Sequence, residues 1–153
     1  MKNVDIISSL NPEQKAFRES LEDRMNFSKN GKIAYIEIPS DDEEWKKLGG
    51  DNTVTSTILN RFRTGVLNNP KYDNVKMVFT FYEANGAYRM SAHSKDCSLL
   101  DYFKHVENNA WPNFTKISGG HANRAGGGIM DSRPEICHNW VQKIVSCEDF
   151  FDN

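Results

Sequence analysis

The sequence lacks the features that mark disulfide-rich and membrane-spanning proteins. Its three cysteines, Cys97, Cys137 and Cys147, are an odd number without a Cys-x-x-Cys pair, which argues against a disulfide framework and favours a reducing compartment. No segment approaches the roughly 20 apolar residues of a membrane helix. The N-terminus has no apolar run of about 7–15 residues of the kind a signal peptide needs. We therefore expect a cytoplasmic protein with no membrane partner.

An excess of one charge is also lacking, and so are the usual metal motifs. The chain has 19 lysines and arginines against 21 acids, a net charge of -2, so whole-chain charge gives no argument for nucleic acid. The four histidines, His93, His105, His121 and His138, are isolated from one another, and no HExxH sequence occurs. A metal set of His121, Asp131 and His138 has no recognised spacing. We expect no metal and no cofactor.

The patterns that are present predict one α/β domain. The 153 residues, 38% hydrophobic and 26% charged, suffice for one globular core. Apolar periodicity and helix-start signals predict helices over residues 12–25, 41–48, 53–67, 96–109 and from 132 onward. Alternating apolar runs predict strands over 32–39, 75–82 and 87–92, the last two joined at Asn85-Gly86. With residues 110–128 as a loop, this order predicts a mixed sheet of about four to five strands flanked by helices.

Two of the predicted helices begin with capping signals. Asn11 precedes Pro12 and stands three residues before Gln14, and Ser132 stands three residues before Glu135. This spacing is typical of a capping box, in which the two side chains bond each other's backbone N–H groups. The sequence therefore predicts a capping box at both helix starts.

The stretch 118–129, SGGHANRAGGGI, is almost free of side chains. Five glycines and two alanines surround His121 and Arg124. Glycine lets a backbone approach a ligand closely, and successive exposed N–H groups bind anions, so the stretch favours a phosphate-binding loop. It is not a P-loop, which needs Gly-Lys-Ser/Thr, nor a dinucleotide fingerprint, which needs a strand leading into it. A plain surface turn is the alternative interpretation.

A second cluster of polar residues lies upstream, in the run RMSAHSK. Arg89, Ser91 and His93 alternate in a predicted strand and therefore share one face, and Lys95 follows them. A concave basic site on a slightly acidic protein is what a phosphate-bearing ligand needs. A solvated charged face is the alternative.

These two motifs carry a resemblance to a known family. SGGHANRAGGG resembles the glycine-histidine loop of the DHH-associated domain, and RMSAHSK resembles that domain's strand ending in Ser-x-Arg-Ser. This is the C-terminal accessory domain of DHH-family phosphoesterases such as RecJ-type exonucleases and nanoRNases. The similarity runs from about residue 32 to residue 144. It implies a nucleotide- or nucleic-acid-binding domain over 32–153 after a helical segment over 1–31, without the catalytic DHH domain.

The resemblance and the glycine stretch together give the candidate binding residues. They are Ser91, His93, Ser94, Gly119, Gly120, His121, Asn123, Arg124, Ala125 and Gly126. The sequence departs from the family where Ser118 replaces a glycine and His93 replaces an arginine. The second change weakens a bidentate phosphate contact. We take Arg124 as the hypothetical replacement for that charge.

Three functions remain open. The first is a stand-alone binding module for nucleotide phosphate, sequestering a short oligonucleotide, a nucleic-acid end, or a cyclic or free nucleotide. The second is a metal-independent phosphodiesterase in which His93 and His121 act as general base and acid. The third is an accessory subunit that completes the site of a catalytic DHH-type phosphoesterase partner. The missing metal-ligand set favours binding over catalysis, and homo-oligomerisation stays open.

Four aromatic residues lie near the two motifs in the sequence: Tyr88, Tyr102, Trp111 and Phe114. One or two of them could stack on a base, which contributes roughly 1–3 kcal/mol per base. Trp111, in a loop before a proline, is the best candidate. For Phe114 we expect core packing.

Overall fold

Six strands form one mixed sheet in the order β1-β2-β3-β4-β6-β5. The computed structural model describes residues 6–152. The strands are β1 (Asn26–Phe27), β2 (Ile33–Ile38), β3 (Met77–Ala84), β4 (Ala87–Ser94), β5 (Ser118–Gly120) and β6 (Arg124–Ile129). The pair β2 and β3 is parallel, and the other neighbouring pairs are antiparallel. The expected mixed sheet is confirmed, with six strands where we expected four to five.

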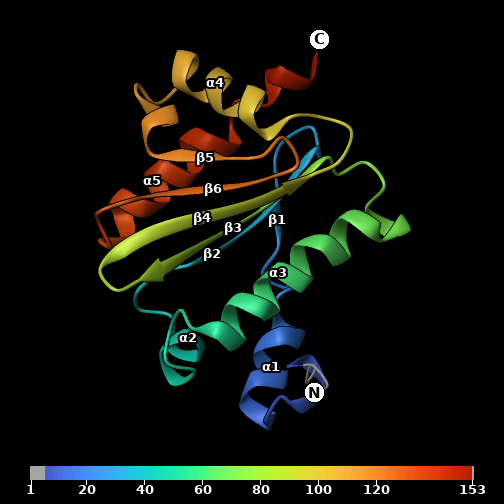
Figure 1. Ribbon diagram of the computed structural model, residues 1–153, viewed down its shortest axis with the longest axis vertical. Coiled ribbons are helices and arrows are strands. Elements are labelled where there is room, and N and C mark those ends of the chain that lie inside the picture. Colours follow the sequence, from blue (N-terminus) through green and yellow to red (C-terminus); the bar gives the residue numbers. More distant parts are fainter. Residues whose placement is uncertain (1–5, 153) are drawn as a thin grey trace.

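Helices cover both faces of this sheet (Figure 1). On one face lie α1 (Pro12–Ser20), α2 (Glu43–Lys47) and α3 (Thr53–Asn68), and on the other lie α4 (Leu99–Asn109) and α5 (Pro134–Val145). Short 3-10 helices are η1 (Ile7–Ser9), η2 (Pro70–Tyr72), η3 (Phe114–Lys116) and η4 (Glu148–Asp152). The α/β fold class is therefore confirmed. Within residues 6–152, none of the helices has the length and apolar character needed to cross a bilayer.

The hydrophobic core is split by the sheet into two layers. Toward α4 and α5 lies an aromatic cluster that includes Phe79, Phe81 and Trp140. Toward α1, α2 and α3 lies a second cluster that includes Phe17 and Trp45. Strand β2 contributes side chains to both layers, which is why both of its faces are buried.

One of the two predicted capping boxes forms. The Gln14 backbone N–H donates to Asn11 Oδ1 over 2.8 Å, and the Asn11 N–H donates to Gln14 Oε1 over 2.9 Å. The box predicted from Ser132 is wrong, because α5 begins at Pro134 with Arg133 as its N-cap and without a side-chain capping bond. Proline favours the first helical position, where its missing N–H is not needed, and the N-cap is therefore Arg133, one residue after the expected Ser132.

The prediction of a loop over residues 110–128 is also wrong. This segment contains η3 and β5 and runs into β6, so the glycine stretch is a β-hairpin with a turn at residues 121–123. Strand β6 lies between β4 and β5. Glycine-rich strands lack the alternating side chains from which a strand is predicted. For this reason β5 and β6 were not predicted from the sequence. The short strand β1 was missed as well.

Candidate functional site

A pocket of about 420 Å³ opens where the end of α3 meets the ends of β4 and the β5–β6 hairpin. It is lined by Thr64, Leu67, Asn68, His93, Ser94, Lys95, Asn123 and Arg124. Four of these, His93, Ser94, Asn123 and Arg124, are among the ten predicted site residues. The sheet register brings two of them together, because His93 in β4 pairs with Arg124 in β6. The two motifs that are separate in the sequence thus meet in one pocket.

The turn of the hairpin is anchored to β4 and to the start of α4. The Ser94 N–H donates to Asn123 O over 3.1 Å, and the Leu99 N–H donates to Ala122 O over 2.6 Å. The Ser94 hydroxyl lies 3.2 Å from Ala122 O and 2.9 Å from Cys97 O. Ser94 therefore acts on the shape of the pocket, because it fixes the turn that carries Asn123 and Arg124.

Helix α3 contributes a residue that the sequence analysis missed, Arg63. Its side chain is buried, with 7% of the residue exposed. Arg63 Nε donates to His93 Nδ1 over 2.9 Å, Nη1 to Thr80 Oγ1 over 2.5 Å and Nη2 to Asn60 Oδ1 over 3.4 Å. All three acceptors are neutral, and no carboxylate within the described part of the chain is bonded to this guanidinium. The one sequence signal was an arginine on the apolar side of a helix, one residue after Phe62.

Further positive charges surround this buried arginine. Arg124 Nη2 donates to the same Asn60 Oδ1 over 3.2 Å, so two guanidinium groups share one amide oxygen. Burial, opposed by Tyr82 and aided by the charge of Arg124, lowers the pKa of Arg63 to about 10, and the group stays protonated at neutral pH. The Lys95 ammonium donates to Leu67 O over 3.2 Å at the end of α3. Clustered cations without a counter-ion cost free energy, and a bound anion would offset that cost.

His93 is buried beside these charges, with 8% of the residue exposed. Burial first, then the charges of Arg63 and Arg124, lower the pKa of His93 to about 4, so the ring is neutral at pH 7. Its Nδ1 accepts from Arg63, and its Nε2 has no hydrogen-bond partner among residues 6–152. A histidine with so low a pKa is poorly suited to proton transfer near neutral pH. His121 is exposed in the turn and is not among the residues that line the pocket.

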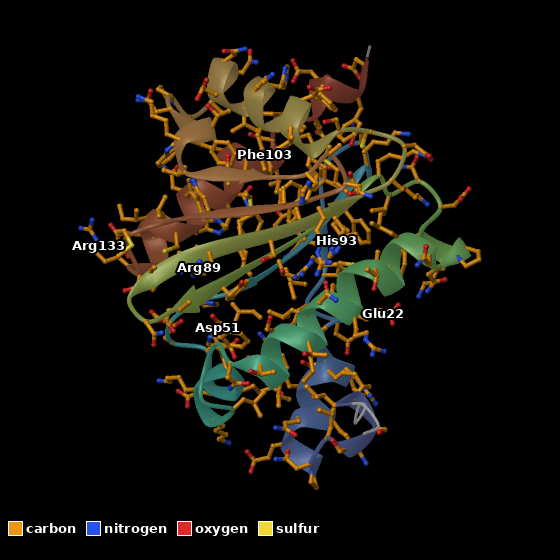
Figure 2. All side chains as sticks on the ribbon, in the orientation of Figure 1. Glu22, Asp51, Arg89, His93, Phe103 and Arg133 are labelled. Carbon is orange, nitrogen blue, oxygen red and sulfur yellow. The ribbon has the colours of Figure 1, made fainter. Side chains whose placement is uncertain are left out.

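The remaining polar candidates lie outside the pocket lining. Ser91 lies on the same face as His93, with its hydroxyl 3.3 Å from the Tyr82 hydroxyl. Arg89 lies farther along β4, at the opposite end of the strand (Figure 2), where its charge acts on Asp51. The polar residues of the run 89–95 therefore do not form one site: His93 and Lys95 line the pocket, and Arg89 lies near Asp51.

The glycines mostly serve strand packing. A Cβ atom would lie 2.7 Å from Met90 O at Gly126 and 2.7 Å from the backbone of residues 124–125 at Gly120, where φ is +139°. Gly119 has no atom within 4 Å of that position. Gly119, Gly120, Ala125 and Gly126 all pair within the hairpin, and Gly119 is the glycine among them whose Cβ position is open.

The aromatic candidates do not reach the pocket. Tyr88, Tyr102 and Phe114 are each at most 1% exposed and lie in the core layer beneath α4 and α5. Trp111 is partly buried against the same cluster. In the part of the chain described, no three His, Cys, Asp or Glu side chains are grouped so as to hold a metal ion.

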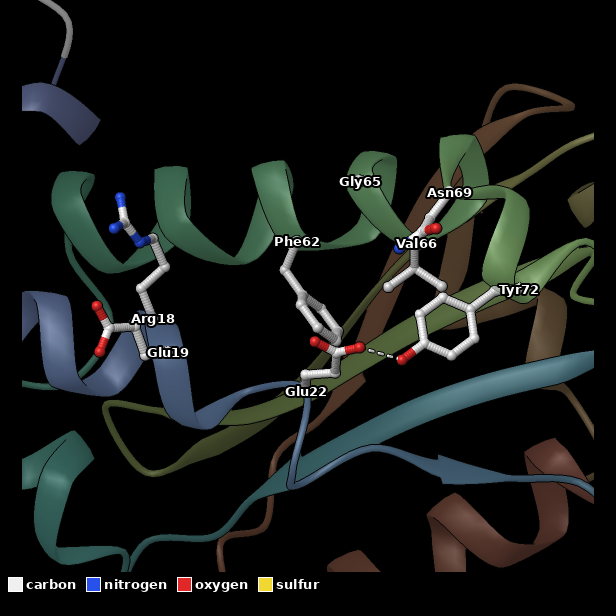
Figure 3. A pocket seen from close by; sticks show the side chains of 8 residues that line it. All are labelled: Arg18, Glu19, Glu22, Phe62, Gly65, Val66, Asn69 and Tyr72. Atoms are coloured by element: carbon white, nitrogen blue, oxygen red, sulfur yellow. Dashed lines mark hydrogen bonds between the residues drawn. The ribbon is translucent and has the colours of Figure 1, made fainter.

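A second pocket, of about 440 Å³, lies between α1 and α3 (Figure 3). Its lining includes Glu19 and Glu22 as well as Arg18. The Tyr72 hydroxyl donates to Glu22, so one of these carboxylates is already engaged. Acidic lining makes this pocket a poor place for an anion.

Comparison with known proteins places the fold. No family model and no curated protein matches the sequence. Among solved structures, the chain is similar to an exopolyphosphatase-related protein from Bacteroides fragilis, with a TM-score of 0.63 and 15% identity over 95% of this chain and 38% of that one. The two share a fold. The chain thus spans less than two fifths of that protein's length.

A second similar structure is a pGpG-specific phosphodiesterase from Vibrio cholerae. Its TM-score is 0.46, at 11% identity over 87% of this chain and 37% of that one. With this lower TM-score, it adds nothing to the conclusion on the fold.

Proposed function

We propose that this domain binds the phosphate group of a nucleotide or short nucleic acid in the pocket between α3, β4 and the β5–β6 hairpin. The ligand class includes short oligonucleotides, nucleic-acid ends, and cyclic or free nucleotides. The observation that carries the proposal is the buried Arg63, which shares Asn60 with Arg124, bonds His93 and has no carboxylate partner among residues 6–152. Fixed cations in a partly dry site attract an anion more strongly than the same charges in water.

Each side chain has a distinct part in this proposal. Arg124 and Lys95 supply charge and N–H donors at the pocket wall, where arginine can grip two phosphate oxygens at once. The Nε2 of His93, which has no hydrogen-bond partner within residues 6–152, adds a donor from the sheet. Asn68 and Asn123 place amide groups at the pocket wall, suited to hydroxyls or base edges.

We also infer a relation to the DHH-associated domains. The shared fold with part of a phosphatase-related protein supports it, together with the glycine-histidine hairpin beside the serine-bearing strand. In this interpretation residues 32–153 are the binding domain and residues 1–31 a helical segment. The first five residues of that segment lie outside the described residues. Its last part adds β1 to the sheet edge.

The test is a ligand titration with pocket variants. The purified protein is titrated in EDTA with mononucleotides, cyclic di- and trinucleotides and short RNA and DNA, and the melting temperature and the integrity of each ligand are measured. Arg124→Ala and Lys95→Ala should each weaken binding by about tenfold or more, since a hydrogen bond to a charged group contributes about 1.5–3 kcal/mol. Arg89→Ala is the matched control, because Arg89 lies on the same strand away from the pocket. It should leave the affinity unchanged.

Three outcomes contradict the proposal. If no ligand raises the melting temperature, or if Arg89→Ala weakens binding as much as Arg124→Ala, the pocket is not the binding site. Cleavage of a ligand in EDTA would show that the protein hydrolyses the ligand rather than only binding it.

A further inference from the structure

The contact between Arg63 and His93 fixes where the ring proton of His93 lies. Arg63 Nε donates to His93 Nδ1 over 2.9 Å. An arginine side chain has donors and no acceptor, so Nδ1 must carry the lone pair. The proton of the neutral ring then lies on Nε2, the nitrogen that has no protein partner in the described chain. Since His93 lines the pocket, this N–H is available to a bound ligand.

We propose that Arg63 is a positioning residue, which holds His93 as the neutral Nε2–H tautomer and so makes it a constant hydrogen-bond donor to the bound anion. The part of this inference that concerns the ligand rests on the proposed function. The part that concerns the tautomer does not.

The groups around His93 oppose a second proton on the ring. The charged groups that face it are Arg63 from α3 and Arg124 from β6, and both disfavour the imidazolium. Lys95 follows directly after the end of β4. Strand β3 places Val78 opposite His93 and sends Thr80 to the same guanidinium, and neither side chain ionises. Protonating Nδ1 would also set an N–H group against the N–H of Arg63 and break their hydrogen bond.

This arrangement has a functional consequence. A histidine at an anion site ordinarily gains a positive charge as the pH falls through about 6.5 and then binds the anion more tightly. Here the ring stays neutral and donates the same single hydrogen bond throughout that range. The affinity for an anion of constant charge is therefore insensitive to pH between 5.5 and 8.

The experiment combines ¹⁵N NMR of the histidine rings with titration of inorganic sulfate, whose charge is constant in this range. In the natural sequence, His93 should show the Nε2-protonated tautomer from pH 5.5 to 8, with a constant sulfate affinity and a ligand-induced shift at Nε2. In Arg63→Met the donor to Nδ1 is gone, so the ring should no longer be held as the Nε2–H tautomer, and its pKa should rise while burial and Arg124 still keep it below the ordinary value. The affinity for sulfate should then begin to rise at the acid end of this pH range.

Two further variants separate positioning from general effects. Arg61→Met, at an exposed position on the same helix, should keep both the tautomer and the flat pH profile. Arg63→Lys retains a charged donor and should restore the tautomer in part.

Each outcome decides a different question. A His93 ring that titrates between pH 5.5 and 7 in the natural sequence overturns the inference, and this measurement needs no variant to fold. An unchanged, purely Nε2-protonated ring in a folded Arg63→Met protein overturns it as well. If sulfate fails to bind at every pH, the proposed anion site is wrong, and with it the ligand half of the inference, while the ring spectrum still decides the tautomer.

Discussion

At the scale of single residues, each glycine of the hairpin meets different surroundings. A Cβ atom at Gly127 would lie 2.3 Å from Ile117 O and 2.8 Å from Ser118 Cα, and at Gly128 it would lie 2.8 Å from Tyr88 O. These contacts are with backbone atoms, which cannot move aside without shifting a strand. At Gly119 the same atom would meet nothing within 4 Å. Close strand packing therefore explains the glycines at positions 127 and 128. At Gly119 the surroundings are open, and packing does not require a glycine there.

This contrast predicts unequal costs for adding one methyl group. Gly127→Ala should lower the free energy of unfolding by about 1–3 kcal/mol, because the added methyl group overpacks the hairpin. Gly119→Ala should change it by no more than about 0.5 kcal/mol. Urea unfolding of both variants measures the difference. Equal stability of the two would contradict the packing explanation.

A bulkier variant at Gly119 tests the binding role without unfolding the hairpin. Gly120 is unsuited to that purpose, because its φ of +139° is one that side chains rarely adopt. If the hairpin surface holds part of the ligand, Gly119→Val should weaken nucleotide binding severalfold while the melting temperature of the free protein stays nearly constant.

At the scale of elements, α3 links the fold to the site. Its start is fixed by Asn52, whose side chain accepts from the N–H groups of Val54 and Thr55 at 3.0 Å each. The Thr55 hydroxyl accepts from the Asn52 N–H in return. The far half of the helix carries Arg63 and the pocket residue Leu67. A loss of order at the helix start therefore affects the element that positions the buried arginine.

The N-cap of α3 can be tested by comparison with the N-cap of α5. Asn52→Ala should destabilise the protein by about 1–2 kcal/mol, because it leaves two N–H groups of the first helical turn without their acceptor. Arg133→Ala, at the N-cap of α5, should have a smaller effect, since Arg133 makes no capping bond there. Thermal and urea unfolding provide the measurement, and a larger loss for Arg133→Ala would refute the assignment of the caps.

At the scale of the whole molecule, the buried histidine makes global stability depend on pH. The pKa of His93 is about 4 in the folded protein and about 6.5 in an unfolded chain. Between these values the unfolded chain binds the proton and the folded protein does not, so stability rises with pH in this window. The contribution of His93 is fully present above about pH 6.5 and is lost as the pH falls toward 4.

We therefore expect the free energy of unfolding to fall between pH 7 and pH 5, before most carboxylates begin to titrate. His93→Gln removes the titrating ring and should reduce the slope of stability against pH in this window. Denaturant unfolding at several pH values measures both slopes. Identical slopes in the two proteins would show that His93 is not the group responsible.

The local signals in the sequence predicted the local structure well. The cap at Asn11, the Asn85-Gly86 turn and the shared face of Ser91 and His93 all depend on residues close together in the chain. The failures came where distant partners decide. Strands β5 and β6 exist because β4 offers an edge to pair with, and Arg63 reaches His93 across 30 positions of sequence.

The sequence by itself determined the α/β class, the helix starts with good caps and the two motifs that meet at the pocket. Periodicity, capping and turn chemistry depend on residues a few positions apart, so they can be recognised in the sequence. The tertiary structure alone decided that the glycine stretch is a paired hairpin and that a buried arginine stands behind His93. Sheet pairing and burial are properties of elements brought together in space, and these also set the charge and the protonation state of the site.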